Sequence, residues 1–154
     1  MKISAFTLGI VLLAGILALP APVLATLGEG PDSVEKDRSA LSASRHAKAS
    51  HATYTVQEVA TEATTVREYL NLSGVVFAVA WDGLVHPDLT TLLGSYAGEY
   101  RDAKRHTQRK RGERRLRVQA SSVIVETWGH MRSLRGRAYL PALVPEGVSV
   151  DEIN

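Results

Sequence analysis

A histidine in the second half of the chain has neighbours that could support acid–base or anion chemistry. His130 stands at an expected turn, shortly before Arg132 and Arg135. Its imidazole could transfer protons, or bind an anion, if Glu68 or Glu126 lay beside it. A turn histidine is more often solvated or hydrogen-bonded to the main chain. His130 is therefore the one catalytic candidate, as the acid or base of a small hydrolase or transferase. The sequence as a whole favours a protein that is not an enzyme.

The strongest charge feature is a basic run over residues 101–117, where nine Lys and Arg face two acidic residues. Such a run could hold an anionic partner, either phospholipid head groups or an acidic polysaccharide. No aromatic residues are interleaved for base stacking, so nucleic acid is the least favoured partner. The alternative is a solvated helix end that continues into a flexible loop around Gly112. With two arginines of a later strand, the candidate anion-binding residues are Arg109, Lys110, Arg111, Arg114, Arg115, Arg135 and Arg137.

Other kinds of chemistry find little support in the sequence. The chain has no Cys, which excludes disulfides, thiol catalysis and cysteine metal sites. It has no H-E-x-x-H motif, phosphate loop or dinucleotide fingerprint, and the five-residue spacing of His46 and His51 suits no shared metal ion. We therefore predict neither a metal nor a cofactor. Trp81 and Trp128 are candidates for a ligand surface, with core packing as the alternative.

The first 25 residues have the three parts of a secretory signal. Lys2 precedes an apolar run over residues 3–19, and small residues lead to Ala25, where we expect cleavage. A membrane anchor is the alternative, but Pro20 interrupts the run and no stop-transfer charges follow at once. The sequence therefore predicts a periplasmic or secreted protein with no transmembrane segment after signal removal.

The segment after the signal, residues 26–52, is expected to be loosely attached. A weak helix is predicted over residues 31–41, followed by an Ala- and Ser-rich linker over 39–52 that lacks the apolar residues needed to offset the entropy of ordering. Residues 53–154 should then form a single domain with a modest core.

The chain is organised around three apolar stretches. Residues 54–59 and 64–70 are rich in β-branched residues and predict a hairpin. Residues 75–81 are apolar on both faces, which predicts a central strand and argues against a short buried helix. Strict alternation would place Val75, Phe77, Val79 and Trp81 on one face of that strand.

A helix is expected from Pro87, which suits a first helical turn. Apolar residues then recur at spacings of three and four up to Tyr100, giving one face that should cover the sheet. Further strands are predicted over 116–118, 123–128 and 131–140, the last with Arg135 and Arg137 on an outer stripe. The C-terminal residues should cap the core through Leu143, Val144, Val148 and Ile153.

These elements predict an α+β fold, with an antiparallel sheet of about five strands packed against one main helix and a flexible N-terminal segment. Several motifs also follow one another in a fixed order along the chain: Val66–Tyr69, Gly74–Trp81, Pro87–Leu89, Leu92–Tyr96, Gly129–Arg132 and Arg135–Pro141. Together they resemble a family of exported bacterial proteins catalogued as domain of unknown function 2844.

The resemblance covers most of the chain after Thr26 and implies a location in the bacterial envelope. It implies no activity and transfers no catalytic residue. One departure is Ala63–Thr65, where the family tends to have a Gly-containing turn. Three functional hypotheses remain: a non-catalytic module that binds an envelope protein through a sheet edge, an anion-binding module, and an enzyme that uses His130.

Overall fold

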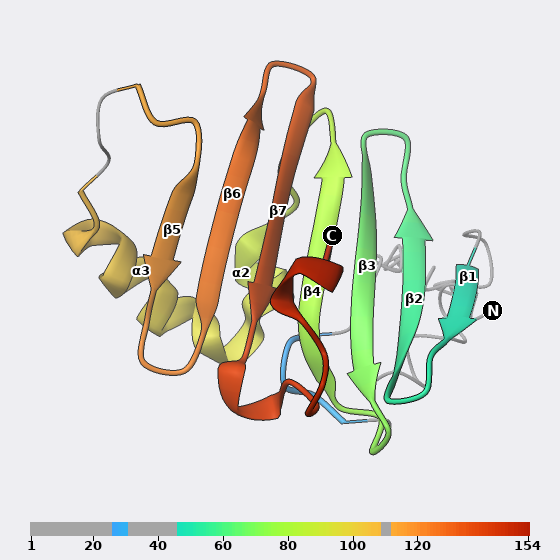
Figure 1. Cartoon of the computed structure of the whole chain (residues 1–154). Coiled ribbons are helices and arrows are strands. Elements are labelled where there is room, and N and C mark those ends of the chain that lie inside the picture. The colour runs from blue at the N-terminus through green and yellow to red at the C-terminus, as the bar shows by residue number, and fades with distance from the viewer. Residues whose placement is uncertain (1–25, 31–45, 109–111) are drawn as a thin grey trace, which may run out of the picture.

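The computed structural model describes residues 26–30, 46–108 and 112–154, with side chains of 46–48 excepted. Within these residues the chain forms one seven-stranded antiparallel sheet in the order β1-β2-β3-β4-β7-β6-β5 (Figure 1). The strands are β1 (His46–Ser50), β2 (Tyr54–Ala60), β3 (Thr64–Asn71), β4 (Val76–Gly83), β5 (Leu116–Gln119), β6 (Ile124–His130) and β7 (Ser133–Tyr139).

Different elements cover the two faces of the sheet. Two α-helices, α2 (Leu89–Leu93) and α3 (Ala97–His106), lie behind it with the short 3₁₀ helix η1 (Gly94–Tyr96) between them (Figure 1). The C-terminal tail, residues 141–154, crosses the front and contains η2 (Pro141–Leu143) and η3 (Val150–Glu152). We call these two sides of the sheet the helix face and the tail face.

The expectation of about five strands is wrong, because the sheet extends further at the N-terminal side. β1 falls within the predicted linker, where no apolar pattern marks a strand. It pairs with β2 in antiparallel register, with Ala49 opposite Val56 and Ser50 opposite Thr55. An edge strand held by main-chain pairing needs no apolar alternation of its own, so the composition of this segment did not indicate β1.

The residues just after the predicted signal are also firmly placed. The Leu27 side chain is buried, its N–H donates to the Leu92 carbonyl at 3.0 Å, and the Gly28 N–H donates to the Val76 carbonyl at 2.8 Å. The N-terminal segment is therefore attached to the domain at both of its described ends. The predicted signal peptide and the weak helix over 31–41 lie outside the described residues.

Strand β4 is central, as its apolar sequence predicts, and residues 76–81 are all buried. The predicted alternation fails at one point. The β3–β4 register shifts between Tyr69 and Leu70, which leaves Phe77 as an extra residue without a direct partner. Phe77 therefore joins the core on the tail face, whereas Val79 and Trp81 belong to the core on the helix face.

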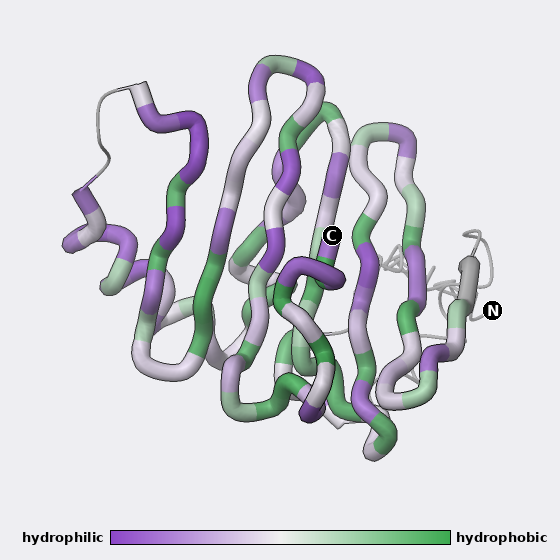
Figure 2. The backbone as a smooth tube through the Cα atoms, in the orientation of Figure 1, coloured by the Kyte–Doolittle hydropathy of each residue, from purple (hydrophilic) through white to green (hydrophobic). Residues whose placement is uncertain are grey.

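Each face has its own hydrophobic core, and hydrophobic residues concentrate on the central strands, whereas the segment that leads into β5 is hydrophilic (Figure 2). The tail supplies part of the second core, as predicted: Ile153 is fully buried, Val144 and Val148 pack beside it, and Leu143 stays exposed. The other main members on the tail face are Tyr54, Tyr69, Phe77, Ile124 and Tyr139.

The single predicted helix is in fact broken and begins later than Pro87. Asp88 is the N-cap of α2, and its Oδ1 accepts a hydrogen bond from the Thr90 N–H at 2.9 Å. The helical path is interrupted at Gly94, which has a positive φ of 49° and lies so close to Thr26 that a Cβ there would overlap its methyl group. The absence of a side chain at Gly94 therefore allows the N-terminal segment to approach the helical region closely.

We predict opposite effects for two Gly→Ala substitutions. A Cβ on Gly136 would lie 2.2 Å from Cζ2 of Trp81, so Gly136→Ala should lower the free energy of unfolding by about 1–3 kcal/mol through overpacking. Gly98→Ala adds a methyl group with nothing within 4 Å near the start of α3, so it should raise that free energy by up to about 1 kcal/mol. Urea denaturation midpoints would compare the two, and equal midpoints would contradict this packing.

Candidate functional site

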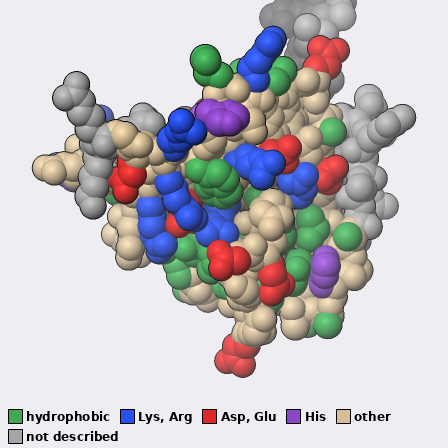
Figure 3. Space-filling model, turned by 45° about the horizontal axis from the view of Figure 1, so that its top comes forward, with side chains coloured by type: hydrophobic (Ala, Val, Ile, Leu, Met, Phe, Trp, Pro, Cys, Tyr) green, Lys and Arg blue, Asp and Glu red, His purple; other side chains and the backbone are tan. Residues whose placement is uncertain are grey.

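Arginines gather on the tail face, across the half of the sheet that the tail leaves open. Figure 3 shows Lys and Arg side chains around a hydrophobic patch on this side of the molecule. Alternation along β7 and the register of its neighbours place these side chains on one surface. We call this group the arginine cluster, and its members are Arg67, Arg115, Arg117, Arg135 and Arg137.

A buried carboxylate, Glu126 on β6, joins three members of the cluster. Its Oε2 accepts from Arg137 Nε at 2.7 Å and from Arg115 Nη2 at 3.1 Å, and its Oε1 accepts from Arg117 Nη1 at 3.1 Å. The Glu126 side chain is 2% exposed. Burial alone would raise the pKa of Glu126, but the hydrogen bond and charge of Arg137, together with the charge of Arg115, hold its pKa below the ordinary value.

Arg137 also connects this ion pair to the tail. Its Nη1 donates to the main-chain carbonyls of Val150 and Ile153, the second at 3.3 Å. The guanidinium is almost fully buried, with Asp151 a further 3.5 Å ion-pair partner at the surface. The predicted outer position for Arg137 is therefore wrong, because the tail folds back over this part of β7.

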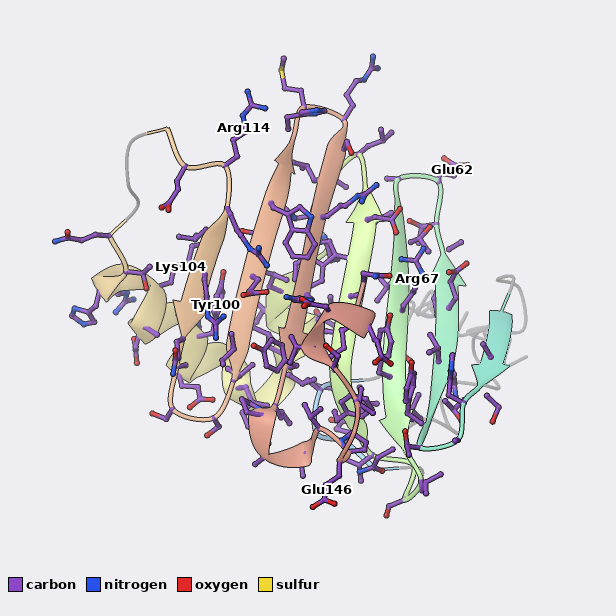
Figure 4. The ribbon with its side chains drawn as sticks, in the orientation of Figure 1. Glu62, Arg67, Tyr100, Lys104, Arg114 and Glu146 are labelled. Atoms are coloured by element: carbon purple, nitrogen blue, oxygen red, sulfur yellow. The ribbon has the colours of Figure 1, made fainter. Side chains whose placement is uncertain are left out.

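Arg67 on β3 makes the corresponding link on the other side of the tail. Its Nε donates to Glu58 Oε2 at 2.9 Å and its Nη1 to Asp82 Oδ1 at 2.7 Å. Nη1 also donates to the main-chain oxygen of Asn154 at 3.3 Å, and Arg67 points across the sheet toward the tail (Figure 4). Burial tends to lower the pKa of Arg67, but Asp82 and Glu58 outweigh it and raise the pKa. Its charge is therefore fully engaged within the domain.

Trp128 on β6 forms the aromatic part of the site. The guanidinium carbons of Arg115 and Arg137 lie 5.4 Å and 5.7 Å from its ring centroid, within the range of cation–π attraction. The side chain is half-buried, so part of the indole remains available on the tail face.

A cleft of about 500 Å³ opens between Trp128 and Arg67. Arg135 lies opposite Asp82 on β4 and opposite Trp128 on β6, so it stands in the middle of this cleft. Arg135 is exposed and, among the residues that the structure describes, makes no ion pair or side-chain hydrogen bond. The complete lining is Arg67, Trp81, Asp82, Trp128, Arg135, Gly136 and Asn154.

The structure brings only some of the predicted anion-binding residues together. Arg115, Arg135 and Arg137 meet on the tail face, whereas Arg114 projects from the segment before β5 at the upper rim (Figure 4). Residues Arg109, Lys110 and Arg111 lie outside the described ranges. Sequence reasoning missed Arg67 as a member of the site. Only the cross-strand register, which no local pattern reveals, shows that Arg67 shares a surface with Arg135.

The two tryptophans have different roles. Trp81 is 1% exposed, its ring lies against Gly136 on the helix face, and its Nε1–H donates to His86 Nδ1 at 3.0 Å. It therefore belongs to the core, as the alternative interpretation held. Of the two, Trp128 alone presents its side chain on the tail face.

His130 lies at the exposed end of β6, away from the two carboxylates considered for it. Glu126 is four residues back on the same strand, about 13 Å along the chain. Glu68 is buried and alternates with Arg67 on β3, so it lies on the opposite face. Within the described ranges His130 makes no side-chain hydrogen bond or ion pair, and no group of three potential metal-ligating side chains occurs there.

Residues 23–153 match the family described as "Protein of unknown function (DUF2844)". The chain belongs to the DUF2844 family. This membership agrees with the resemblance of its sequence motifs. No curated protein and no solved structure matches the chain. In the part of this DUF2844 chain that the structure describes, no helix has the length and apolar character to cross a bilayer.

We predict that Glu126→Gln removes the charge that holds three arginines and lowers the free energy of unfolding by about 2–4 kcal/mol. The folded-state pKa of Glu126 is depressed, so its stabilising contribution is present above the pKa of an unfolded Glu, about 4.3, and is lost as pH falls through the folded pKa. The variant should therefore lose less stability than the wild type as pH falls from about 5 to about 3.

Asp102→Asn is the matched control, because the Asp102–Arg105 pair is 3.5 Å long and exposed. It should change the free energy of unfolding by less than about 0.5 kcal/mol. Chemical denaturation at several pH values measures both variants. An effect of Glu126→Gln no larger than that of the control would refute a structural role for Glu126.

Proposed function

We propose that this DUF2844 protein is an exported bacterial binding module without catalytic activity, which holds an anionic ligand in the cleft around Arg135. The observation that carries the proposal is the contrast within the arginine cluster. Arg67, Arg115, Arg117 and Arg137 each have carboxylate partners, whereas Arg135 has none among the described residues. An exposed guanidinium inside a cleft is suited to a two-pronged contact with a carboxylate or phosphate.

The other walls of the cleft favour an acidic sugar as the ligand. The Trp128 indole beside Arg135 provides a flat apolar surface for a sugar ring. Asp82 uses Oδ1 for Arg67, which leaves Oδ2 to accept a hydrogen bond from a sugar hydroxyl. At about 500 Å³, the cleft lies within the usual size range for small-ligand sites. We therefore propose an acidic oligosaccharide segment of an envelope polymer.

Two further observations support a binding role in the envelope. Asp82 and Glu126 are both paired with arginines. Although burial would raise the pKa of Glu126, Arg137 and Arg115 lower it, which leaves this carboxylate unsuited to donating a proton at neutral pH. The sequence of residues 1–25 has the pattern of a secretory signal. Together they favour a periplasmic or secreted protein that binds without transforming its ligand.

We predict that the protein binds an oligogalacturonate probe and that affinity falls as salt rises, because charge pairing is screened. Arg135→Glu should weaken binding at low salt by about tenfold or more, equivalent to about 1.4 kcal/mol. The affinity of Arg135→Lys should lie between those of the wild type and Arg135→Glu, since lysine keeps the charge but lacks the planar fork of the guanidinium. Isothermal titration across a salt series, with inorganic phosphate as a second probe, measures these differences.

The control is Arg105→Glu, which makes the same charge change at an exposed site on α3 and should leave affinity within about twofold. Binding by Arg135→Glu at wild-type strength would contradict the proposed site. Binding of phosphate but not of the sugar acid would correct the ligand class, and binding of neither would contradict the function.

A further inference from the structure

One end of the sheet carries an exposed rim built from three separate segments. It consists of the β2–β3 turn at 61–63, the residues after β4 at 84–85, and the β6–β7 turn at 131–132, all at the upper end of the sheet (Figure 1). A hollow of about 230 Å³ is lined by residues from all three segments, so they lie side by side. We call this surface the loop rim.

The loop rim exposes three large apolar side chains. Met131 is 91% exposed, and Leu84 and Val85 are each 52% exposed. The main chain beneath them is fixed: the Val85 carbonyl accepts from Thr64 Oγ1 at 2.8 Å, and the Leu84 N–H donates to the Ala63 carbonyl at 2.7 Å. These side chains are therefore held outward by an ordered scaffold.

The tip of the β6–β7 hairpin departs from the residues that such a turn prefers. His130 pairs with Ser133, which leaves a two-residue turn of Met131 and Arg132. Arg132 has a φ of 65° and is the one non-glycine residue with a positive φ among the described residues. Gly or Asn normally occupies that position because a side chain is disfavoured there. Met131 and Arg132 therefore occupy this turn against the local conformational preference, which points to a functional role for their side chains.

Charge at the loop rim favours an anionic surface as the partner. Arg132 and Arg114 are exposed and form no ion pair with any described residue, and Arg114 and Glu62 both project at this end of the molecule (Figure 4). Glu62 on the rim, and the exposed Glu113 next to Arg114 in the chain, are the acidic residues that oppose these cations. Apolar side chains flanked by cations are the combination that binds a bilayer interface, where the apolar groups enter the boundary between head groups and acyl chains.

We propose that the loop rim docks on an anionic phospholipid bilayer, with Met131, Leu84 and Val85 entering the interface and Arg132 and Arg114 contacting lipid phosphates. The side chains that dock differ from those that hold the ligand in the cleft, although Asp82 and Arg135 line both the cleft and the hollow of the loop rim. Docking would leave the tail face accessible to a polymer near the membrane.

Vesicle flotation tests the proposal with residues 26–154, the protein that remains after the expected cleavage, because the apolar run over residues 3–19 would itself enter vesicles. Vesicles containing phosphatidylglycerol should bind it, with binding that weakens as salt rises, and pure phosphatidylcholine vesicles should bind it much less. The double variant Leu84→Ser/Met131→Ser should lower partitioning into anionic vesicles by about tenfold or more. Leu72→Ser is the matched control, because Leu72 is 80% exposed in the β3–β4 turn at the other end of the sheet and should not affect binding.

Two further measurements separate docking from a folding defect. Glu62→Lys removes the opposing charge at the rim and should strengthen binding severalfold, which a destabilised protein would not show. The chain has no Cys, so Met131→Cys and Leu72→Cys each give one site for an environment-sensitive fluorophore. Emission should shift to shorter wavelength with anionic vesicles at position 131 and not at position 72.

Absence of wild-type binding to anionic vesicles would overturn the proposal, as would a fluorophore at position 131 that remains in water. If the double variant binds vesicles as the wild type does but loses a crosslink to an envelope protein, the loop rim is a protein-docking surface instead.

Discussion

The buried Glu126 carboxylate is the interaction on which the tail face depends. A carboxylate that is 2% exposed is tolerable only when it is paired and hydrogen-bonded. Three guanidiniums surround Glu126: Arg137 comes from β7, Arg117 from β5, and Arg115 from the segment before β5. Through Arg137 the same network fixes the tail, whose carbonyls accept from the other end of that guanidinium. Because the tail is held there, it covers one part of the sheet and leaves the cleft beside Arg135 open.

The site therefore depends on which arginines are paired with carboxylates across several strands. Arg67 and Arg137 lie on either side of the tail, and each satisfies both a carboxylate and a tail carbonyl. Their charges hold the structure together and are unsuited to binding a ligand. Arg135, two residues before Arg137 on β7 and opposite Asp82, has no carboxylate partner among the described residues and faces the cleft. A count of basic residues could not make this distinction, since all of these arginines look alike in sequence.

The parts of the fold with a strong local signal could be predicted, and the others depended on distant contacts. The unbroken apolar character of β4 predicted a central strand, and alternation predicted that Arg135 and Arg137 share a face. The edge strand β1 carried no such signal, because main-chain pairing with β2 defines it. Phe77 was assigned to the wrong face, since the register shift that turns it comes from β3. Arg137 was expected in solvent. The residues that cover it, Val150 and Ile153, lie 13 and 16 positions later in the chain, so no local pattern indicated its burial.

The central claim is that one arginine of the cluster is free for ligand while the others are locked in the structure, and the side-chain Nε–Hε NMR signals of arginine test it most directly. We expect the Nε–Hε protons of Arg67 and Arg137 to exchange slowly, because both nitrogens donate to carboxylates. The Arg135 proton should exchange rapidly and be the one whose signal moves when an acidic oligosaccharide is added. A slowly exchanging Arg135, or a ligand-induced shift centred on Arg137, would contradict this account.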